Sequence, residues 1–364
     1  QPTYRMGHLE LRNGDWLLMR NPSPYNRFTD LSPGLFTHVG VVSTEIGADG
    51  LRRFVIVDLP ERGDRIPAHN VETYLSRSLH YIFLRHPNPA VADTMGDAAL
   101  SMLGNDTQFD LTFRTDRVES LKGQALKGKV INTYCAGFLL ICAQQTGLPR
   151  KHFFPFSELP AAGHCVQNLK TLGLSIGDEF VSPTGAFFST NLKLIGACQP
   201  LYDPTREVKE AVYDHFAQSL VDRQLVPSPD MRQWIVQKLA QASTTNRWLT
   251  KALARANNVS EHLDLESAAK AAAVIQALDE IADGNMEQYA AALEAVATSA
   301  DPDSQPNGEP DGEGLAEYRE RHPDLVRQWR AGALSPHQLR SSLVRYYSRR
   351  GQEQLDERFF PSTR

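Results

Sequence analysis

Residue Cys135 stands at the predicted start of an apolar helix over residues 132–147. The polar residues Asn132 and Thr133 precede it and are expected to cap the helix, whose buried face includes Cys142 two turns later. A thiol in the first turn lies beside unsatisfied backbone N–H groups and the positive end of the helix dipole, and both favour the thiolate. The position suits a nucleophile, although most free cysteines are part of a hydrophobic core.

A base for this thiol is offered by His38, in the first strand of a predicted β-hairpin over residues 36–59. Side chains alternate between the two faces of a strand, so the register decides which residues His38 can meet. A three-residue loop at residues 47–49 would set His38 directly opposite Asp58, with about 5 Å between their Cβ atoms. The hairpin therefore predicts an imidazole–carboxylate pair, which a slip of one residue would separate.

Each of these residues also has an ordinary structural interpretation. Cys135 is consistent with a core cysteine, His38 with a polar residue at a strand start, and Asp58 with a turn-forming carboxylate. Taken together they favour chemistry, because a thiol with a pKa near 8.5 needs an imidazole to become a thiolate at neutral pH. The imidazole in turn needs a partner on its second nitrogen to fix its tautomer and orientation.

Composition excludes several classes of function. The 364 residues carry a formal net charge of −5, so we expect no nucleic-acid partner and no anionic membrane surface as a partner. Hydrophobic residues make up 41% of the chain, yet no apolar run is long enough to span a bilayer. The four cysteines form no Cys-x-x-Cys pattern, and we expect neither a metal nor a cofactor. Cys165 and Cys198 are the pair considered for a disulfide in an oxidising compartment.

The order of the predicted elements indicates an α+β fold followed by an α-helical extension. Strands and short helices alternate in a first domain over residues 1–204. Apolar residues then recur three and four positions apart, which predicts an α-helical region over residues 205–299. Residues 300–314 are expected to be a flexible acidic linker and residues 315–364 a helical, Arg-rich tail. Within the helical region, helices are expected at residues 207–224, 229–243, 246–256, 262–283 and 286–299.

Several short motifs follow one another in a defined order: Gly14-Asp15, Thr37-His38-Val39-Gly40, the carboxylate Asp58 after the next strand, Phe109-Asp110, and Tyr134-Cys135 at a helix start. This order resembles the circularly permuted NlpC-like branch of the papain-fold cysteine hydrolases, the YiiX-type proteins, in which histidine precedes cysteine. The match covers about residues 10–200, and its specificity comes from the order and spacing of the motifs. It implies a papain-like domain in which an antiparallel sheet packs on the cysteine-bearing helix.

The resemblance also implies roles for individual residues. Cys135 resembles the nucleophile of that family, His38 its general base and Asp58 the residue that orients the base. The family commonly has glutamate at the third position, and Glu61 is the alternative to Asp58 in this chain. A Ser-Glu pair usually follows the family's cysteine, whereas Ala136-Gly137 stands there in this chain.

A family of this kind implies a cysteine hydrolase that cleaves an amide bond, in a cell-wall peptide such as peptidoglycan or in another small amide, through an acyl-enzyme. Two alternatives stay open. A thiol acyltransferase or lipid acyl hydrolase could use Phe153-Phe-Pro-Phe156 and Phe187-Phe188 as an apolar wall. A papain-fold binding module without turnover is the other alternative, and Ala136-Gly137 favours it.

Expectations for compartment and partners rest on three features. The chain begins with Gln1, has no apolar span and resembles cell-envelope hydrolases, so we expect an exported bacterial protein, either periplasmic or secreted. Its substrate is expected to be a peptide or a small acyl-containing molecule. The helical extension is expected to contain no catalytic residue and to offer a surface for a protein partner.

Overall fold

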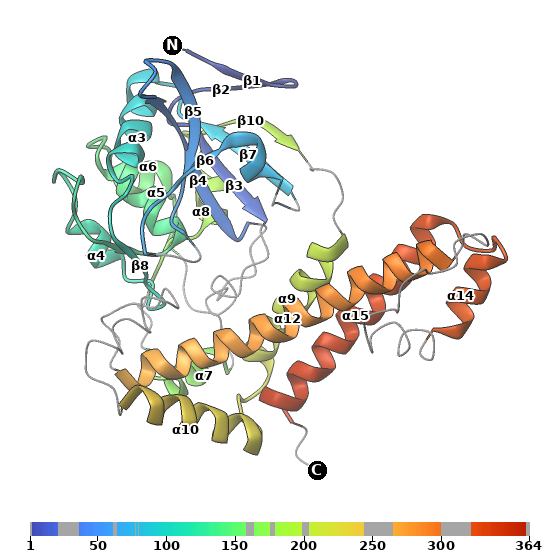
Figure 1. Cartoon of the computed structure of the whole chain (residues 1–364). Helices are drawn as coiled ribbons and strands as arrows, with labels where there is room; N and C mark the ends of the chain where they lie inside the picture. The colour runs from blue at the N-terminus through green and yellow to red at the C-terminus, as the bar shows by residue number, and fades with distance from the viewer. Residues whose placement is uncertain are drawn as a thin grey trace.

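The computed structural model has a mixed α+β fold, in which helices cover a six-stranded antiparallel sheet (Figure 1). The predicted α+β class, with an antiparallel sheet and an α-helical extension, is confirmed at this level. The structure describes residues 2–20, 36–60, 64–76, 78, 80–157, 164–174, 179–198, 204–243, 265–299 and 322–361.

The strand that begins with His38 lies inside the sheet, between two other strands. The strand order is β10-β7-β3-β4-β5-β6, and each neighbouring pair is antiparallel. The central strands are rich in large apolar and β-branched residues, which suit a sheet that is buried on both faces. The strands are β3 (Trp16–Arg20), β4 (His38–Ile46), β5 (Arg52–Val57), β6 (Ala68–Asn70), β7 (His80–Arg85) and β10 (Lys193–Cys198).

The predicted hairpin of β4 and β5 is present, but its predicted register is wrong. Ile46 pairs with Arg52, because the connection over residues 47–51 is two residues longer than the loop expected from the sequence. A shift of two residues returns every side chain to its original face. His38 is therefore a diagonal neighbour of Asp58 rather than its directly opposite partner.

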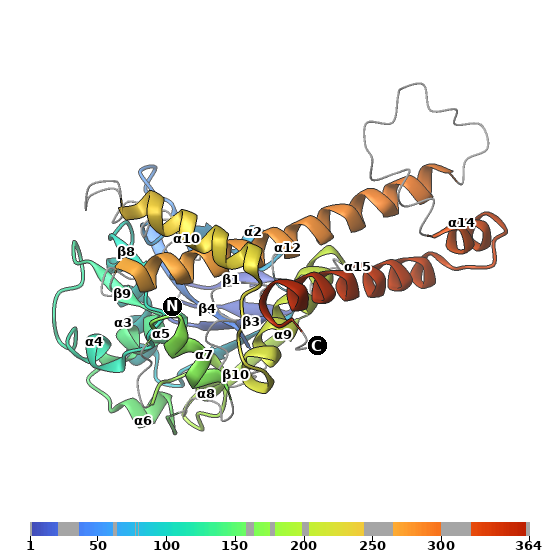
Figure 2. The same ribbon diagram turned by 90° about the horizontal axis from the view of Figure 1, so that it is seen from below.

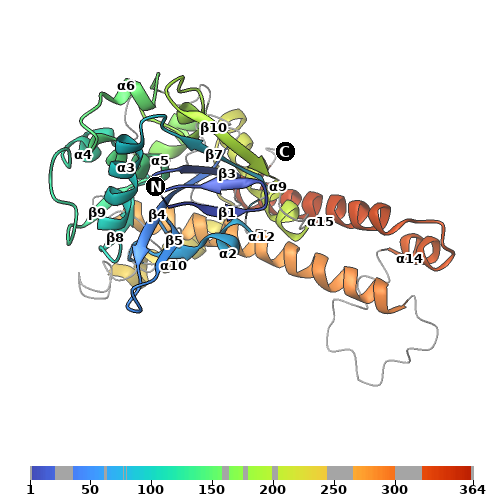
Figure 3. The same ribbon diagram turned by 90° about the horizontal axis from the view of Figure 1, so that it is seen from above.

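Different elements cover the two faces of the sheet. The helices α3 and α5 pack on the face that carries Val39 and Val41. The other face carries Val42 and Ile56 and is covered by α2 and by a small two-stranded sheet (Figures 1 and 3). These covering elements are α2 (Val71–Leu75), α3 (Pro89–Ser101), α5 (Cys135–Gln144), β1 (Tyr4–Met6) and β2 (Leu9–Leu11).

The helix α5 begins at Cys135, directly after a short pair of parallel strands, β8 and β9. The expected caps are wrong: Asn132 and Thr133 both lie in β9, and the N-cap residue, Tyr134, makes no side-chain capping bond. The remaining short elements are β8 (Thr107–Phe109), β9 (Ile131–Thr133), α4 (Thr115–Glu119), α6 (Arg150–Phe153), α7 (Cys165–Thr171) and α8 (Pro183–Phe187).

Long helices follow the sheet in the chain, and the helices predicted over residues 207–224 and 229–243 are confirmed. Figure 2 shows α12 and α15 extending away from the sheet, with α14 near their far end. No helix in the described ranges is both long and apolar enough to cross a membrane. The long helices are α9 (Pro204–Asp222), α10 (Pro229–Ser243), α12 (Leu265–Ser299), α14 (Pro323–Arg330) and α15 (Pro336–Phe359).

One continuous helix, α12, replaces the two helices predicted over residues 262–283 and 286–299. Asn285 stands at the predicted break and is buried. Its side-chain amide donates to the carbonyl of Ile281 at 2.8 Å, inside the helix, and to Gln354 of α15 at 2.8 Å. Contacts with the neighbouring helix thus override the weak helix propensity of this residue. The helix predicted over residues 246–256 and the linker over residues 300–314 lie outside the described residues.

One apolar cluster joins the sheet to the long helices. It includes Trp16 of the sheet, Phe138 of α5, Leu169 of α7, Phe216 of α9 and Leu278 of α12, all almost fully buried. The domain boundary predicted between residues 204 and 205 coincides with the start of α9, but the hydrophobic core continues across it.

An ion pair joins α9 to the end of β3. The Arg20 guanidinium lies 2.7 Å from the Glu210 carboxylate and 3.0 Å from the Asp214 carboxylate. Glu210 is 5% exposed, so its contact with Arg20 is buried between the helices and the sheet, whereas the Asp214 side chain is 46% exposed.

The disulfide considered between Cys165 and Cys198 is not formed. Cys165 is a free thiol that is 2% exposed, at the start of α7 among the apolar residues of the core. Burial raises its pKa to about 11. This cysteine is therefore an inert core residue.

Candidate active site

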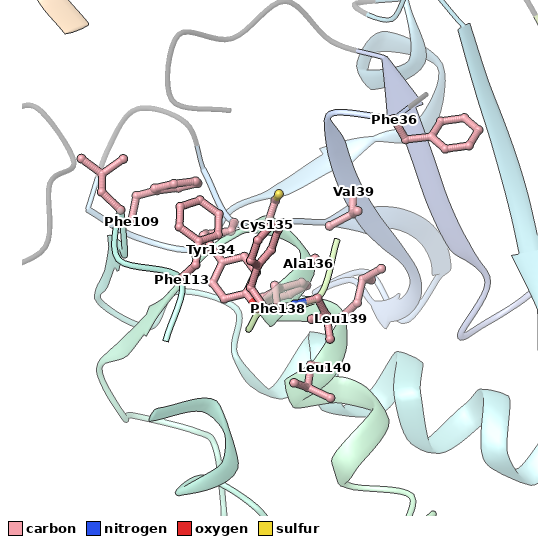
Figure 4. Packing of buried hydrophobic residues seen from close by; sticks show 14 of the residues in the cluster. Phe36, Val39, Phe109, Phe113, Tyr134, Cys135, Ala136, Phe138, Leu139 and Leu140 are labelled. Carbon is pink, nitrogen blue, oxygen red and sulfur yellow. Dashed lines mark hydrogen bonds between the residues drawn. The ribbon is translucent and has the colours of Figure 1, made fainter. Parts of the chain in front are cut away.

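The thiol of Cys135 lies at the end of the sheet, beside the first residues of β4. Its sulfur is 3.8 Å from the carbonyl oxygen of Thr37, to which the S–H group donates. That carbonyl belongs to the peptide bond that joins Thr37 to His38. Figure 4 shows the Cys135 side chain pointing away from Phe138 and Leu140, which anchor α5 in the core. The helix thus presents its cysteine to the strand that carries the predicted base.

Depth of burial separates this cysteine from the second one in the same helix. Cys135 is 6% exposed, whereas Cys142 is completely buried, and burial raises the pKa of the Cys142 thiol. A thiol held neutral among apolar residues is a poor nucleophile. Of the two cysteines in α5, Cys135 is the candidate for chemistry.

The predicted contact between His38 and Asp58 is confirmed. His38 Nε2 lies 2.8 Å from Asp58 Oδ2, and the two side chains are 2% and 4% exposed. Asp58 follows the last residue of β5 and shares the face of the sheet that carries Ile56 and α2. Cys135 approaches from the other face, with α5. The candidate site lies where residues from both faces reach the first peptide of β4.

Two further residues bind the same carboxylate, and sequence reasoning missed both. His69 Nε2 lies 3.0 Å from Asp58 Oδ1, and the hydroxyl group of Tyr74 donates to Asp58 Oδ2. The rings of His69 and Tyr74 are in contact, with 4.7 Å between their centroids. Neither residue belongs to a recognisable motif. The sequence did offer one signal: Asn70 is a typical N-cap residue. Its side chain caps α2, the helix that carries Tyr74.

Hydrogen bonding keeps the Asp58 carboxylate ionised inside the protein. Burial acts to raise its pKa, but the hydrogen bonds from His38 and His69 outweigh burial and lower the pKa to about 2. An ionised carboxylate only accepts hydrogen bonds, so Nε2 of each imidazole carries a proton. Nδ1 is then the nitrogen with which His38 can act as a base.

Acid should remove the stability that this carboxylate provides. The pKa of Asp58 is about 2 in the folded protein against an ordinary 3.8, so its contribution is complete above about pH 4 and is lost as the pH falls towards 2. A shift of this size corresponds to about 2 kcal/mol. We expect the difference in unfolding free energy between the wild type and Asp58→Asn to shrink by about that amount between pH 6 and pH 2, measured by urea denaturation. A constant difference would contradict this assignment.

The residues after Cys135 face the core rather than the site. Ala136 is completely buried, and a Cβ atom added to Gly137 would lie 2.1 Å from Thr133 Oγ1. A Ser-Glu pair would not fit this backbone.

The residue before Cys135 packs on a residue with an unusual backbone. The ring of Phe113 packs on Tyr134 with 4.6 Å between centroids, and Phe113 adopts a positive φ of 52°. A non-glycine residue in that region is uncommon, and such strain often occurs near functional sites.

The remaining predictions for the site concern Glu61 and bound groups. Glu61, the alternative to Asp58, lies outside the described residues. Among the described residues, no group of three or more His, Cys, Asp or Glu side chains is arranged to hold a metal ion.

Comparison of the chain with protein-family models, curated proteins and solved structures found no match.

Proposed function

We propose that the chain is a papain-like cysteine hydrolase that cleaves an amide bond. Cys135 is its nucleophile, His38 its general base and Asp58 the residue that orients the base. The observation that carries this proposal is the buried His38–Asp58 pair, located one residue from the carbonyl that the Cys135 thiol contacts. A buried imidazole–carboxylate pair has little reason to form for packing alone, because burying polar groups costs free energy.

The reaction follows from the protonation states at the site. Nδ1 of His38 takes the proton of the Cys135 thiol, and the imidazolium that forms is stabilised by the charge of Asp58. The thiolate attacks the substrate carbonyl, and the tetrahedral oxyanion accepts a hydrogen bond from the Cys135 backbone N–H at the start of α5. His38 then protonates the leaving amine and, in the second half of the reaction, activates the water that hydrolyses the acyl-enzyme.

The proposed oxyanion position lies at the first turn of α5, where backbone N–H groups have no partner within the helix. Its N-cap residue, Tyr134, makes no side-chain capping bond. The substrate that we propose is a cell-wall peptide or another small amide. An exported location and a protein partner for the long helices belong to the same proposal.

A row of four contacting phenylalanine rings favours a second candidate function, the transfer or hydrolysis of a lipid acyl group by the same thiol. Phe36 directly precedes Thr37, and its ring contacts Phe187 with 5.7 Å between centroids. Phe187 contacts Phe188, and Phe188 contacts Phe156. Phe188 and Phe156 are 54% and 45% exposed, so the four rings run from the surface to Phe36, the residue before Thr37. A preference for long-chain over short-chain acyl esters that Phe188→Ser abolishes would support this candidate.

Acyl labelling tests the main proposal. A fluorescent activated ester should label Cys135 in a Cys198→Ser background, and Cys135→Ala should remove the adduct, located by peptide mass spectrometry. Cys142 serves as the internal control, because it lies in the same helix and is completely buried. Spontaneous loss of the label, with release of the free acid, would indicate hydrolysis. A stable adduct would favour the binding module, and a Cys135 no more reactive than Cys142 would exclude the thiol chemistry.

A further inference from the structure

The Asp58 carboxylate is shared by two imidazoles that come from the two strands flanking β5. His38 begins β4, and His69 is the middle residue of β6. In the register of the sheet, His69 pairs with Ile56, two residues before Asp58 and on the same face. Each histidine is thus a diagonal neighbour of the carboxylate, one on either side. His38 Nε2 meets Oδ2 at 2.8 Å and His69 Nε2 meets Oδ1 at 3.0 Å.

The two histidines differ in their access to solvent. The side chain of His38 is 2% exposed and that of Asp58 is 4% exposed, whereas the side chain of His69 is 21% exposed. Protons from solvent therefore have a more direct route to His69 than to His38. Among the described residues, the Tyr74 hydroxyl from α2 also bonds the carboxylate, and Glu72 of the same helix is bonded to Tyr4 instead.

A single negative charge cannot fully support two cations. When His69 is neutral, its N–H group holds Asp58 in place, and the whole charge of the carboxylate is available to stabilise a His38 imidazolium. When His69 takes up a proton, it forms an ion pair with Asp58, and a second positive charge beside the same carboxylate becomes unfavourable. The ability of His38 to accept the thiol proton then falls.

We propose that His69 is a positioning residue that orients Asp58 towards His38 and, on protonation, lowers the reactivity of the site. This inference rests on the proposed function for its effect on Cys135. Its effect on the titration of His38 is independent of that function. Because His69 is the partly exposed member of the cluster, solvent can reach it without opening the buried pair of His38 and Asp58.

Two substitutions of His69 and one control variant separate the orientation of Asp58 from the charge on His69. His69→Gln keeps an N–H donor near Asp58 but cannot titrate, while His69→Ala removes the donor as well. His337→Gln is the matched control, because His337 is exposed on α15, far along the chain from the sheet. The rate of Cys135 alkylation by iodoacetamide is measured from pH 5 to pH 9 in each full-length variant, and the chemical shifts of the His38 ring are followed over the same range.

We expect Cys135 of His69→Gln to be alkylated at the wild-type rate at pH 8. At pH 5.5 it should be alkylated about threefold or more faster than Cys135 of the wild type. His69→Ala should be slower at pH 8 by about threefold to tenfold, consistent with the loss of one positioning hydrogen bond. The His38 titration should move upwards by about half a pH unit in His69→Gln and not in His337→Gln. An unchanged His38 titration and an unchanged pH profile in His69→Gln would overturn the inference. A shifted His38 titration with an unreactive Cys135 would support the inference and contradict the hydrolase.

Discussion

Replacing His38 by alanine should slow acyl labelling of Cys135 about a hundredfold or more at pH 7. A free thiol with an ordinary pKa near 8.5 is only a few per cent thiolate at that pH, and a positioned base typically contributes about 10²–10⁴ to such reactions. His38 is 2% exposed and bonded to Asp58, so its ring is already held in place before a substrate binds. Labelling kinetics with the same fluorescent ester provide the measurement.

Two controls make that result specific. His337→Ala removes an exposed imidazole elsewhere in the chain and should leave the rate unchanged. Raising the pH to 10 should recover most of the rate in His38→Ala, because hydroxide then supplies the thiolate without a base. A His38→Ala protein that is folded, as judged by circular dichroism, and labelled at the wild-type rate would remove His38 from the mechanism.

Gly14→Ala should be among the most destabilising single substitutions in the chain, by about 4 kcal/mol. A Cβ atom at this position would lie 1.7 Å from the carbonyl oxygen of Ala92, a main-chain atom of α3 that cannot turn aside. Overlap of this kind costs about 3 kcal/mol when a core has to shift. The φ of +84° adds about 1 kcal/mol for any residue other than glycine.

Gly50→Ala isolates the second of these two effects. Gly50 has a φ of +74°, and a Cβ atom there would meet nothing within 4 Å. Its substitution should cost about 1 kcal/mol. Urea denaturation of both variants measures the difference, and equal losses would show that α3 moves away from Gly14 at little cost.

The imidazole–carboxylate pair was predictable because it depends on the face of the strand, which an error of two residues in the turn length does not change. The sequence predicts a three-residue loop, and the structure has residues 47–51 in the connection. An error of two residues leaves His38 and Asp58 on one face, where side chains can still meet diagonally. An error of one residue would have separated them.

His69 was not predictable in the same way. It lies 31 residues after His38 in the sequence, and its contact with Asp58 requires β6 to pair with β5 in a register that three residues define. Nothing local to residues 68–70 specifies that register. The capping of α5 failed for a related reason: Asn132 and Thr133 have good capping side chains, but a parallel pairing with β8 holds their backbone in a strand.

The expected disulfide and the expected break at residue 285 were both overridden by packing. Cys165 is a core residue, and Asn285 is buried against α15 through hydrogen bonds that a sequence pattern does not show. Long-range contacts decide such positions, whereas local propensity decides the exposed ones.

The apolar cluster that joins the sheet to the long helices determines how the protein melts. Phe138 of α5 and Leu278 of α12 belong to the same cluster, so unfolding of either region would expose apolar surface of the other to water. We expect segments that share a core in this way to open together, as one cooperative unit, with amide protons that exchange with solvent at a common slow rate. The rigidity of the helix that begins with Cys135 is thereby supplied in part by residues more than a hundred positions later in the chain.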